Sequence, residues 1–252
     1  MVNLLDKGHI KLVETWGSDE SIIEAARMST GKGFNGWGPL ACPVNHDDIR
    51  GICKKCNGTN RLPGDEKLLG YLYSNKHMTP FEMAGMIIEV KAPIFVFREW
   101  HRHRTQSYNE MSARYIPLPD ENYIPSIERL MAGGNAVTTN KQAQGGGGLP
   151  EHHAVIWREQ LKDLYQHAQE VYEEGIRLGI PKELSRLPVP VARYSRMRAS
   201  ASLRNWMAFL TLRMDESAQW EIREYANAVG TLIAEKFPQT WKLFNQEKEA
   251  SK

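Results

Sequence analysis

The sequence of 252 residues has no run of eighteen apolar residues, and its first residues lack the pattern of a signal peptide. These absences predict a soluble, cytoplasmic protein with no membrane partner. The formal net charge is only +2, because 32 basic residues nearly balance 30 acidic ones. So small a charge does not indicate electrostatic binding of nucleic acid by the protein as a whole. Local clusters of arginine in such a chain favour a small anionic ligand.

Cysteine is scarce: the chain has three, all between Cys42 and Cys56, which fits a reducing compartment. They lie in residues 31–65, where glycine, proline, asparagine and aspartate are frequent and no periodicity persists, so we expect an inserted lobe. Cys42 with His46 and Cys53 with Cys56 form two short-spaced pairs of the residue types that hold structural zinc, as in a zinc knuckle. The alternative is three reduced thiols and a surface histidine. A nucleophilic Cys42 is disfavoured in so polar an insertion.

No glycine fingerprint of a dinucleotide-binding fold is present, and the glycine-rich residues 132–149 predict a mobile surface loop rather than a phosphate cradle. Hydrophobic periodicity predicts secondary structure elsewhere. The expected strands are residues 8–16 and 86–90, and an extended piece is expected around residues 188–190. Two helices are expected to begin at residues 18 and 79. Further helices are expected over residues 66–73, 93–100, 151–178, 182–186, 199–213 and 216–237.

The segment Arg102–Tyr115 is the most informative part of the sequence. Arg102, His103 and Arg104 follow the helix expected at 93–100, and the residues after them are mostly polar. A helix C-terminus favours cations, but three cationic or titratable groups followed by a polar loop exceed that need. Guanidinium groups bind phosphate or carboxylate in a bidentate manner, so the segment predicts an anion site.

Three motifs in this order resemble the family of flavin-dependent thymidylate synthases. The first is His77-x-Thr79-Pro80-Phe81-Glu82. The second is the Arg-His-Arg run with its serine and the Asn-Glu-x-Ser-x-Arg-Tyr tail, within Arg102–Tyr115. The third extends from Ser202 through Arg213 to Ile222. The resemblance implies an α+β fold with a mixed central sheet and packed helices, in a single domain over residues 1–252. It does not extend to the inserted lobe or to the glycine-rich loop.

Carried over residue by residue, the resemblance implies two sets of ligand contacts. The residues expected to bind FAD are His77, Thr79, Glu82, Arg102, His103, Arg104, Asn109, Glu110, Ser202, Arg204 and Ala208. The residues expected to bind dUMP are Glu99, Arg102, Glu110, Met111, Ser112, Ala113, Arg114, Arg186 and Arg213.

Arg213 is the expected catalytic residue. A fixed cation beside the N3–O4 edge of uracil stabilises the negative charge that develops there and makes C5 nucleophilic, so no covalent enzyme nucleophile is needed. Ser112 could instead be read as a nucleophile, but Glu110 and Arg114 do not form a histidine-based relay beside it. Phosphate binding is therefore the expected role of Ser112.

The implied reaction is reductive methylation of dUMP to dTMP, with 5,10-methylenetetrahydrofolate as carbon donor, FAD as hydride carrier and NADPH as reductant. The resemblance also implies a homotetramer whose subunits share active sites. Glu99, Ser202 and Ala208 depart from residues common in the family, which leaves open hydroxymethylation or a related pyrimidine nucleotide. A nucleic-acid-binding module built on a zinc knuckle is the alternative from another class, and the near-neutral charge argues against it.

Overall fold

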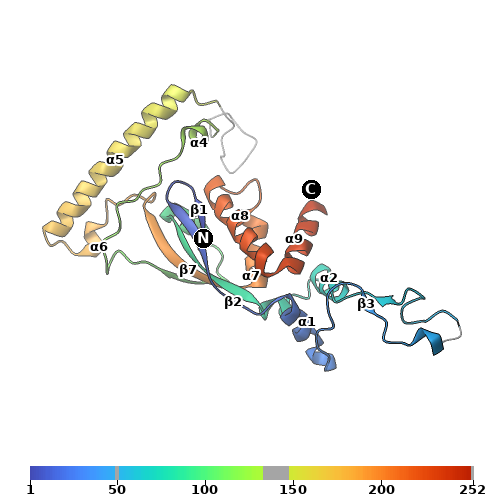
Figure 1. Ribbon diagram of the computed structural model, residues 1–252. Helices are drawn as coiled ribbons and strands as arrows, with labels where there is room; N and C mark the ends of the chain where they lie inside the picture. The colour runs from blue at the N-terminus through green and yellow to red at the C-terminus, as the bar shows by residue number, and fades with distance from the viewer. Residues whose placement is uncertain (49–50, 133–147, 251–252) are drawn as a thin grey trace. The chain divides into compact units, whose positions relative to one another are not determined.

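The computed structural model describes residues 1–48, 51–132 and 148–250, and it has the expected α+β fold (Figure 1). A five-stranded sheet has the order β1-β2-β5-β7-β6, and a two-stranded sheet pairs β3 with β4. The strands are β1 Val2–Leu4, β2 Gly8–Trp16, β3 Leu40–Ala41, β4 Arg61–Leu62, β5 Gly85–Pro93, β6 Ser107–Glu110 and β7 Tyr194–Ser202. The α-helices are α1 Asp19–Arg27, α2 Glu66–Ser74, α3 Ile94–Trp100, α4 Ile127–Ala132, α5 Glu151–Arg177, α6 Lys182–Ser185, α7 Leu203–Arg213, α8 Trp220–Lys236 and α9 Pro238–Ala250. The 3₁₀ turns are η1 Met28–Thr30, η2 His46–Asp48 and η3 Thr79–Glu82.

The chain divides into two compact units, each built from three separate segments. Unit 1 comprises residues 1–14, 87–200 and 208–229, and unit 2 comprises residues 15–86, 201–207 and 230–252. Strands β2, β5 and β7 each begin in one unit and end in the other. That the whole chain is a single domain stays a prediction.

Aromatic side chains from α3, α7 and α8 form the core of unit 1. The rings of Trp100 and Phe209 stack with centroids 4.6 Å apart, and both side chains are fully buried. Tyr225 packs edge-on against Trp100 and donates a hydrogen bond to the carbonyl of Lys91 in β5. This core fixes the C-terminal end of α3 against α7, where the predicted anion site begins.

In unit 2, α1 begins where the sequence predicts. Gly17 takes a left-handed φ of 63°, which lets the chain leave β2, and Ser18 caps α1 in a capping box with Ser21. The carboxylate of Asp19, also in the first turn, accepts hydrogen bonds from the backbone N–H groups of Gln239 and Thr240 at 2.8 and 3.1 Å. Asp19 thus caps the first turn of α9 from the other end of the sequence.

Some expected elements are wrong. The helix expected from Thr79 is only the 3₁₀ turn η3, because the chain becomes extended at Gly85 and continues into the β-branched residues of β5. The helix expected over 199–213 starts at Leu203, since residues 194–202 form β7, and the helix expected over 216–237 starts at Trp220. Strands β1 and β6 and helix α9 were not expected. The predicted loop at 132–149 lies almost wholly outside the described residues.

None of the helices within residues 1–48, 51–132 and 148–250 is both long and apolar enough to cross a membrane.

Candidate active site

The Arg-His-Arg run lies directly after α3, as expected. Arg102 and Arg104 are exposed, whereas His103 between them is half-buried. The hydroxyl of Tyr108 donates hydrogen bonds to the carbonyls of His103 and Trp100, at 2.7 and 3.2 Å, and so ties the turn back to the end of α3. The sequence motifs gave Tyr108 no role. A single aromatic residue in an otherwise polar run could have indicated a side chain that is held in place.

Arg213, at the end of α7, meets two residues that lie about 110 positions earlier in the chain. Its Nε donates to Nε2 of His103 at 2.9 Å, its Nη2 donates to the carbonyl oxygen of Glu99 at 3.0 Å, and its Nη1 lies 3.0 Å from the Glu99 carboxylate. The Arg213 side chain is 17% exposed and that of Glu99 41%. A cation fixed at three points is pre-oriented, which is the property expected of a group that stabilises charge in a transition state.

His103 is neutral in this arrangement. Burial, and then the nearby Arg213 guanidinium, lower the pKa of His103 to about 4, while Glu99 opposes the shift. Its ring also packs edge-on against Phe209, at 4.9 Å between centroids, one helical turn before Arg213. A neutral imidazole accepts the Arg213 hydrogen bond at Nε2, so the guanidinium keeps its full charge.

A cavity of about 490 Å³ in unit 1 gathers most of the expected substrate contacts. It is lined by five predicted residues from two distant segments of the sequence: Glu110, Met111, Ser112, Ala113 and Arg186. The lining that sequence analysis missed is mostly apolar: Ile94, Leu118, Leu187, Val189 and Ser195. The hydroxyl of Ser195 is buried and has no hydrogen-bond partner among the described residues, so it is available to a ligand.

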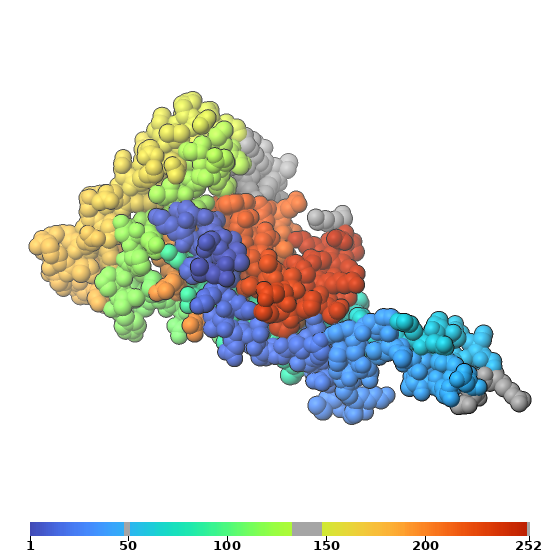
Figure 2. Space-filling view, in the orientation of Figure 1, coloured from blue at the N-terminus to red at the C-terminus, as the bar shows by residue number. Residues whose placement is uncertain are grey.

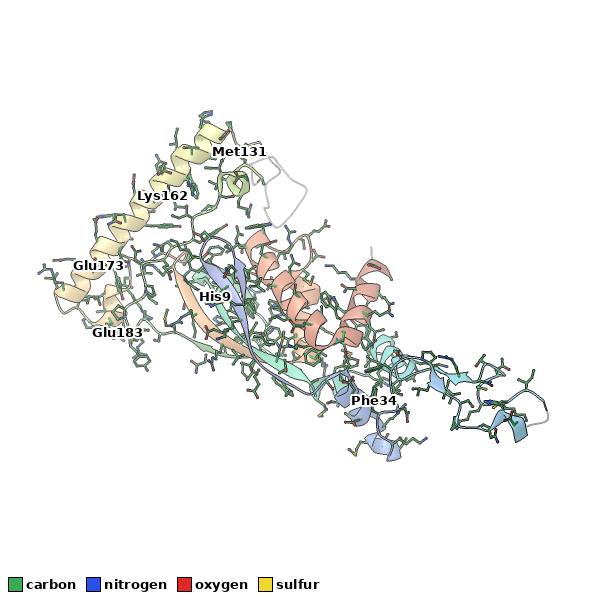
Figure 3. The ribbon with its side chains drawn as sticks, in the orientation of Figure 1. His9, Phe34, Met131, Lys162, Glu173 and Glu183 are labelled. Atoms are coloured by element: carbon green, nitrogen blue, oxygen red, sulfur yellow. The ribbon has the colours of Figure 1, made fainter. Side chains whose placement is uncertain are left out.

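Four predicted substrate contacts are not part of the cavity lining: Glu99, Arg102, Arg114 and Arg213. Arg114 lies elsewhere on the surface of unit 1. Its exposed guanidinium lies 3.5 Å from the carboxylate of Glu183, a residue of α6 that is labelled in Figure 3. The same helix contributes Lys182, whose Nζ donates to the carbonyl of Tyr115 at 2.8 Å. These contacts hold the turn after Ser112 against α6, and Arg186 directly follows the last residue of α6.

The remaining predicted flavin contacts divide between the units. In unit 2, Arg204 at the start of α7 forms an exposed ion pair with Glu82 of η3, which brings two of the three family motifs together. The hydroxyl of Ser202 is buried without a partner in the part of the chain that is described. His77 and Thr79 precede or begin η3, and the His77 ring packs edge-on against Tyr71. In unit 1, Asn109 pairs with Arg198 across β6 and β7, and Ala208 is exposed on α7.

The four predicted metal ligands lie together in unit 2. One potential ligand atom from each of Cys42, His46, Cys53 and Cys56 lies within 4.8 Å of the others. Backbone N–H groups of Cys56 and Lys55 donate to the Cys53 sulfur and lower the pKa of its thiol to about 6. All three cysteines are free of disulfides.

The pre-oriented arginine and the cavity are features typical of a small-molecule binding site. A family model described as "Thymidylate synthase complementing protein" matches residues 11–239. The chain belongs to this family, as the sequence motifs predicted.

Curated relatives and solved structures agree with this assignment. The flavin-dependent thymidylate synthase of Thermus thermophilus is 35% identical over 245 residues, which are 97% of this chain and 78% of that protein. The enzyme of the same name from Thermosipho africanus is 35% identical over 249 residues, covering 96% of this chain and 92% of the relative. A crystal structure of the UMP/dUMP methylase PolB from Streptomyces cacaoi, bound with 5-Br UMP, is similar with a TM-score of 0.74 and 29% identity over 96% of both chains.

Proposed function

We propose that this protein methylates dUMP to dTMP, using 5,10-methylenetetrahydrofolate, FAD and NADPH. The observation that carries the proposal is the cavity in unit 1, where Glu110, Met111, Ser112, Ala113 and Arg186 come together from separate segments. Its volume of about 490 Å³ lies within the range usual for small-molecule sites. The names of the curated relatives and of the similar structure support the same substrate.

In this proposal, Ser112 and Arg186 bind the nucleotide phosphate. Arg186 supplies a guanidinium fork, and the Ser112 hydroxyl supplies a hydrogen bond at the same cavity. Arg114 lies outside the cavity lining and pairs with Glu183, so it meets the nucleotide of a neighbouring subunit or exchanges its partner on binding. The buried hydroxyl of Ser195 adds a donor or acceptor that the sequence motifs did not include.

Arg213 activates the pyrimidine. Methylation at C5 places negative charge on the N3–O4 edge, and a pre-oriented guanidinium stabilises that charge without reorganising. The contacts to His103 and Glu99 engage all three guanidinium nitrogens of Arg213, and each Nη carries a second N–H for the substrate. The neutral state of His103 leaves Arg213 as the cation of this pair.

The residues present fit a flavin. Arg102 and Arg104 offer exposed guanidinium groups suited to a pyrophosphate, and Ser202 offers a buried hydroxyl with no partner among the described residues. His77, Thr79, Glu82, His103, Asn109, Glu110, Arg204 and Ala208 complete the proposed contacts. FAD, when bound, supplies the hydride that completes the methyl group. The protein's own residues bind, orient and polarise the reactants.

A homotetramer with shared active sites is part of the proposal, and α5 supports association of copies. Four exposed apolar residues follow one another at seven-residue spacing, three on α5 and one at its C-cap: Trp157, Leu164, Val171 and Leu178 are 48%, 60%, 46% and 60% exposed. Three other side chains of α5 are buried: those of Ala154, Tyr165 and Tyr172. Figure 2 shows the surface of α5 in yellow. A heptad stripe of this kind is suited to packing against another helix.

The decisive experiment is an assay of the purified full chain. We expect yellow protein whose flavin spectrum bleaches with NADPH, and dTMP identified by mass when dUMP and 5,10-methylenetetrahydrofolate are added. Protein that cannot be reconstituted with FAD would refute the proposal. A product heavier than dTMP by one oxygen would identify hydroxymethylation instead.

UMP is a second candidate substrate, because the similar structure is of a UMP/dUMP methylase. Parallel assays with UMP and dUMP at equal concentrations decide between them. We expect the kcat/KM value for dUMP to exceed that for UMP, and the reverse order would assign the protein to ribonucleotide methylation.

A further inference from the structure

We propose that Cys42, His46, Cys53 and Cys56 bind one structural zinc ion, which holds together the tip of the inserted lobe, residues 40–62. Three thiolates and one imidazole are a complete ligand set for zinc. The site does not depend on nucleotide methylation, and it lies in a part of the sequence that the family motifs do not cover.

The ligand atoms already lie close together, within 4.8 Å of one another, near the spacing that one zinc ion requires. Zn–S bonds of about 2.3 Å at tetrahedral angles place two sulfur atoms about 3.8 Å apart. The sulfur atoms of Cys42 and Cys53 are 4.0 Å apart, and Nε2 of His46 lies 3.1 Å from the sulfur of Cys56. A disulfide, by contrast, needs sulfur atoms about 2.05 Å apart.

The lobe tip has no other core. Of its described residues, only Cys53 and Cys56 are buried, at 5% exposed each, whereas Ile52 beside them is 71% exposed. The regular structure there amounts to two paired residues in each of β3 and β4 and the single turn η2. A segment this small cannot bury enough apolar area to order itself, so it needs a metal or a covalent link.

The base of the lobe is fixed in a different way. The buried carboxylate of Asp65 forms a bidentate pair with Arg27 and accepts the backbone N–H of Asn35 at 2.7 Å. Glu66 accepts the backbone N–H of Gly38. In Figure 3, Phe34 marks this base. The network ends before residue 40, so the tip depends on its own ligands.

Two of the cysteine sulfur atoms accept hydrogen bonds from the backbone. The N–H groups of Lys55 and Cys56 point at the Cys53 sulfur, and that of Val44 points at the Cys42 sulfur. Asn57 and Gly58 take left-handed φ values of 50° and 78°, which turns the chain directly after the second ligand pair. The Cys42 N–H then bonds to the carbonyl of Asn60 at 3.0 Å and joins the two ligand pairs.

Four protein ligands fill the tetrahedron, so no position remains for water or substrate. The role of the ion is therefore to stabilise the lobe and not to catalyse. Binding requires three deprotonated thiols, so the protons leave to solvent and the bound site carries one net negative charge. Lys54 and Lys55, between the second pair of cysteines, lie in sequence where they balance that charge.

Metal analysis of the full chain, purified without chelators, tests the proposal. We expect about one zinc per chain, and a cobalt(II)-substituted protein with the strong visible bands of a tetrahedral thiolate site. Cys53→Ser and His46→Ala should lose the zinc, while His46→Cys, which offers a fourth thiolate, should retain it. His152→Ala removes an exposed histidine of α5 and serves as the matched control, with zinc unchanged.

Proteolysis gives a second readout that does not depend on the variants. Removing zinc with a chelator should open the lobe tip to cleavage, and readdition should restore protection. The proposal is overturned by trace zinc together with absent cobalt–thiolate bands, by iron in place of zinc, or by a mass two hydrogens lower that reveals a disulfide. Equal zinc in wild type, Cys53→Ser and His46→Ala would overturn it as well.

Discussion

Arg213 is the residue on which the proposed chemistry depends. Replacing it with alanine should lower kcat for dUMP by about 10²-fold or more, because a pre-oriented charge at the pyrimidine is lost. Flavin binding should persist, since Arg213 is assigned to the substrate. Steady-state kinetics and the flavin spectrum measure the two effects separately.

Arg177→Ala is the matched control for this substitution. Arg177 ends α5 as Arg213 ends α7, but its side chain is 70% exposed and pairs only with Glu174 in the described contacts. We expect near wild-type kcat. Wild-type turnover in Arg213→Ala would contradict the activation step.

The environment of His103 predicts how the free energy of unfolding depends on pH. The pKa of His103 falls from its usual 6.5 to about 4 in the folded protein, so the unfolded chain takes up a proton first as the pH drops. Stability that His103 contributes is therefore complete above pH 6.5 and is lost as the pH falls through 4. In flavin-free His103→Gln, the free energy of unfolding should fall less steeply between pH 6.5 and 4 than in wild type. Parallel slopes from denaturant titrations would refute this origin.

At the scale of residues, the sequence predicted the ligand types better than their pairing. Three carboxylates are among the predicted site residues, and nothing in the chain order reveals that Glu99 is the one that pairs with Arg213. Likewise Arg186 could be placed at the Ser112 cavity only through the family resemblance. Ser195 was missed because its burial is a property of the fold and not of its neighbours in sequence.

Among the elements, α9 depends on a cap that comes from α1. The buried Asp19 carboxylate bonds to two N–H groups of α9 and to the Thr240 hydroxyl at 2.6 Å, although burial still raises the pKa of Asp19. Asp19→Ala should lower the free energy of unfolding by roughly 2 kcal/mol, since hydrogen bonds to a charged group are lost and their donors stay buried. Denaturant unfolding measures the change.

Glu24→Ala in the same helix is the control, because Glu24 is exposed and the substitution leaves the cap intact. Its effect should stay within about 0.5 kcal/mol. A loss in Asp19→Ala no larger than that of the control would show that the cap contributes little.

Strand β7 explains why one element was predicted wrongly. Arg196, Met197, Arg198 and Ala199 alternate between exposed and buried side chains, which is the period of a strand. Alanine, serine and arginine are weak strand formers, so the residue types favoured a helix while the alternation indicated a strand. Burial of β7 between β5 and β6 decided the outcome.

For the whole molecule, the exposed stripe on α5 predicts the state of assembly. If the proposed tetramer packs through this stripe, Leu164→Lys or Val171→Lys should shift it to smaller species, because a charge in a helix interface is costly to bury. Gln166→Lys, on the polar side of α5, should leave the assembly unchanged. Light scattering after size exclusion measures the mass, and a tetramer in all three variants would place the interface elsewhere.

The sequence separation of contacting residues also affects when each part of the protein folds during synthesis. Asp19 and Gln239 are 220 positions apart, so the cap between α1 and α9 cannot form on the ribosome until almost the whole polypeptide has emerged. The ligands of the lobe tip, by contrast, lie within residues 42–56 and can meet early in translation. The proposed zinc site and the cap on the last helix therefore form at opposite ends of biosynthesis, and only the cap completes the fold.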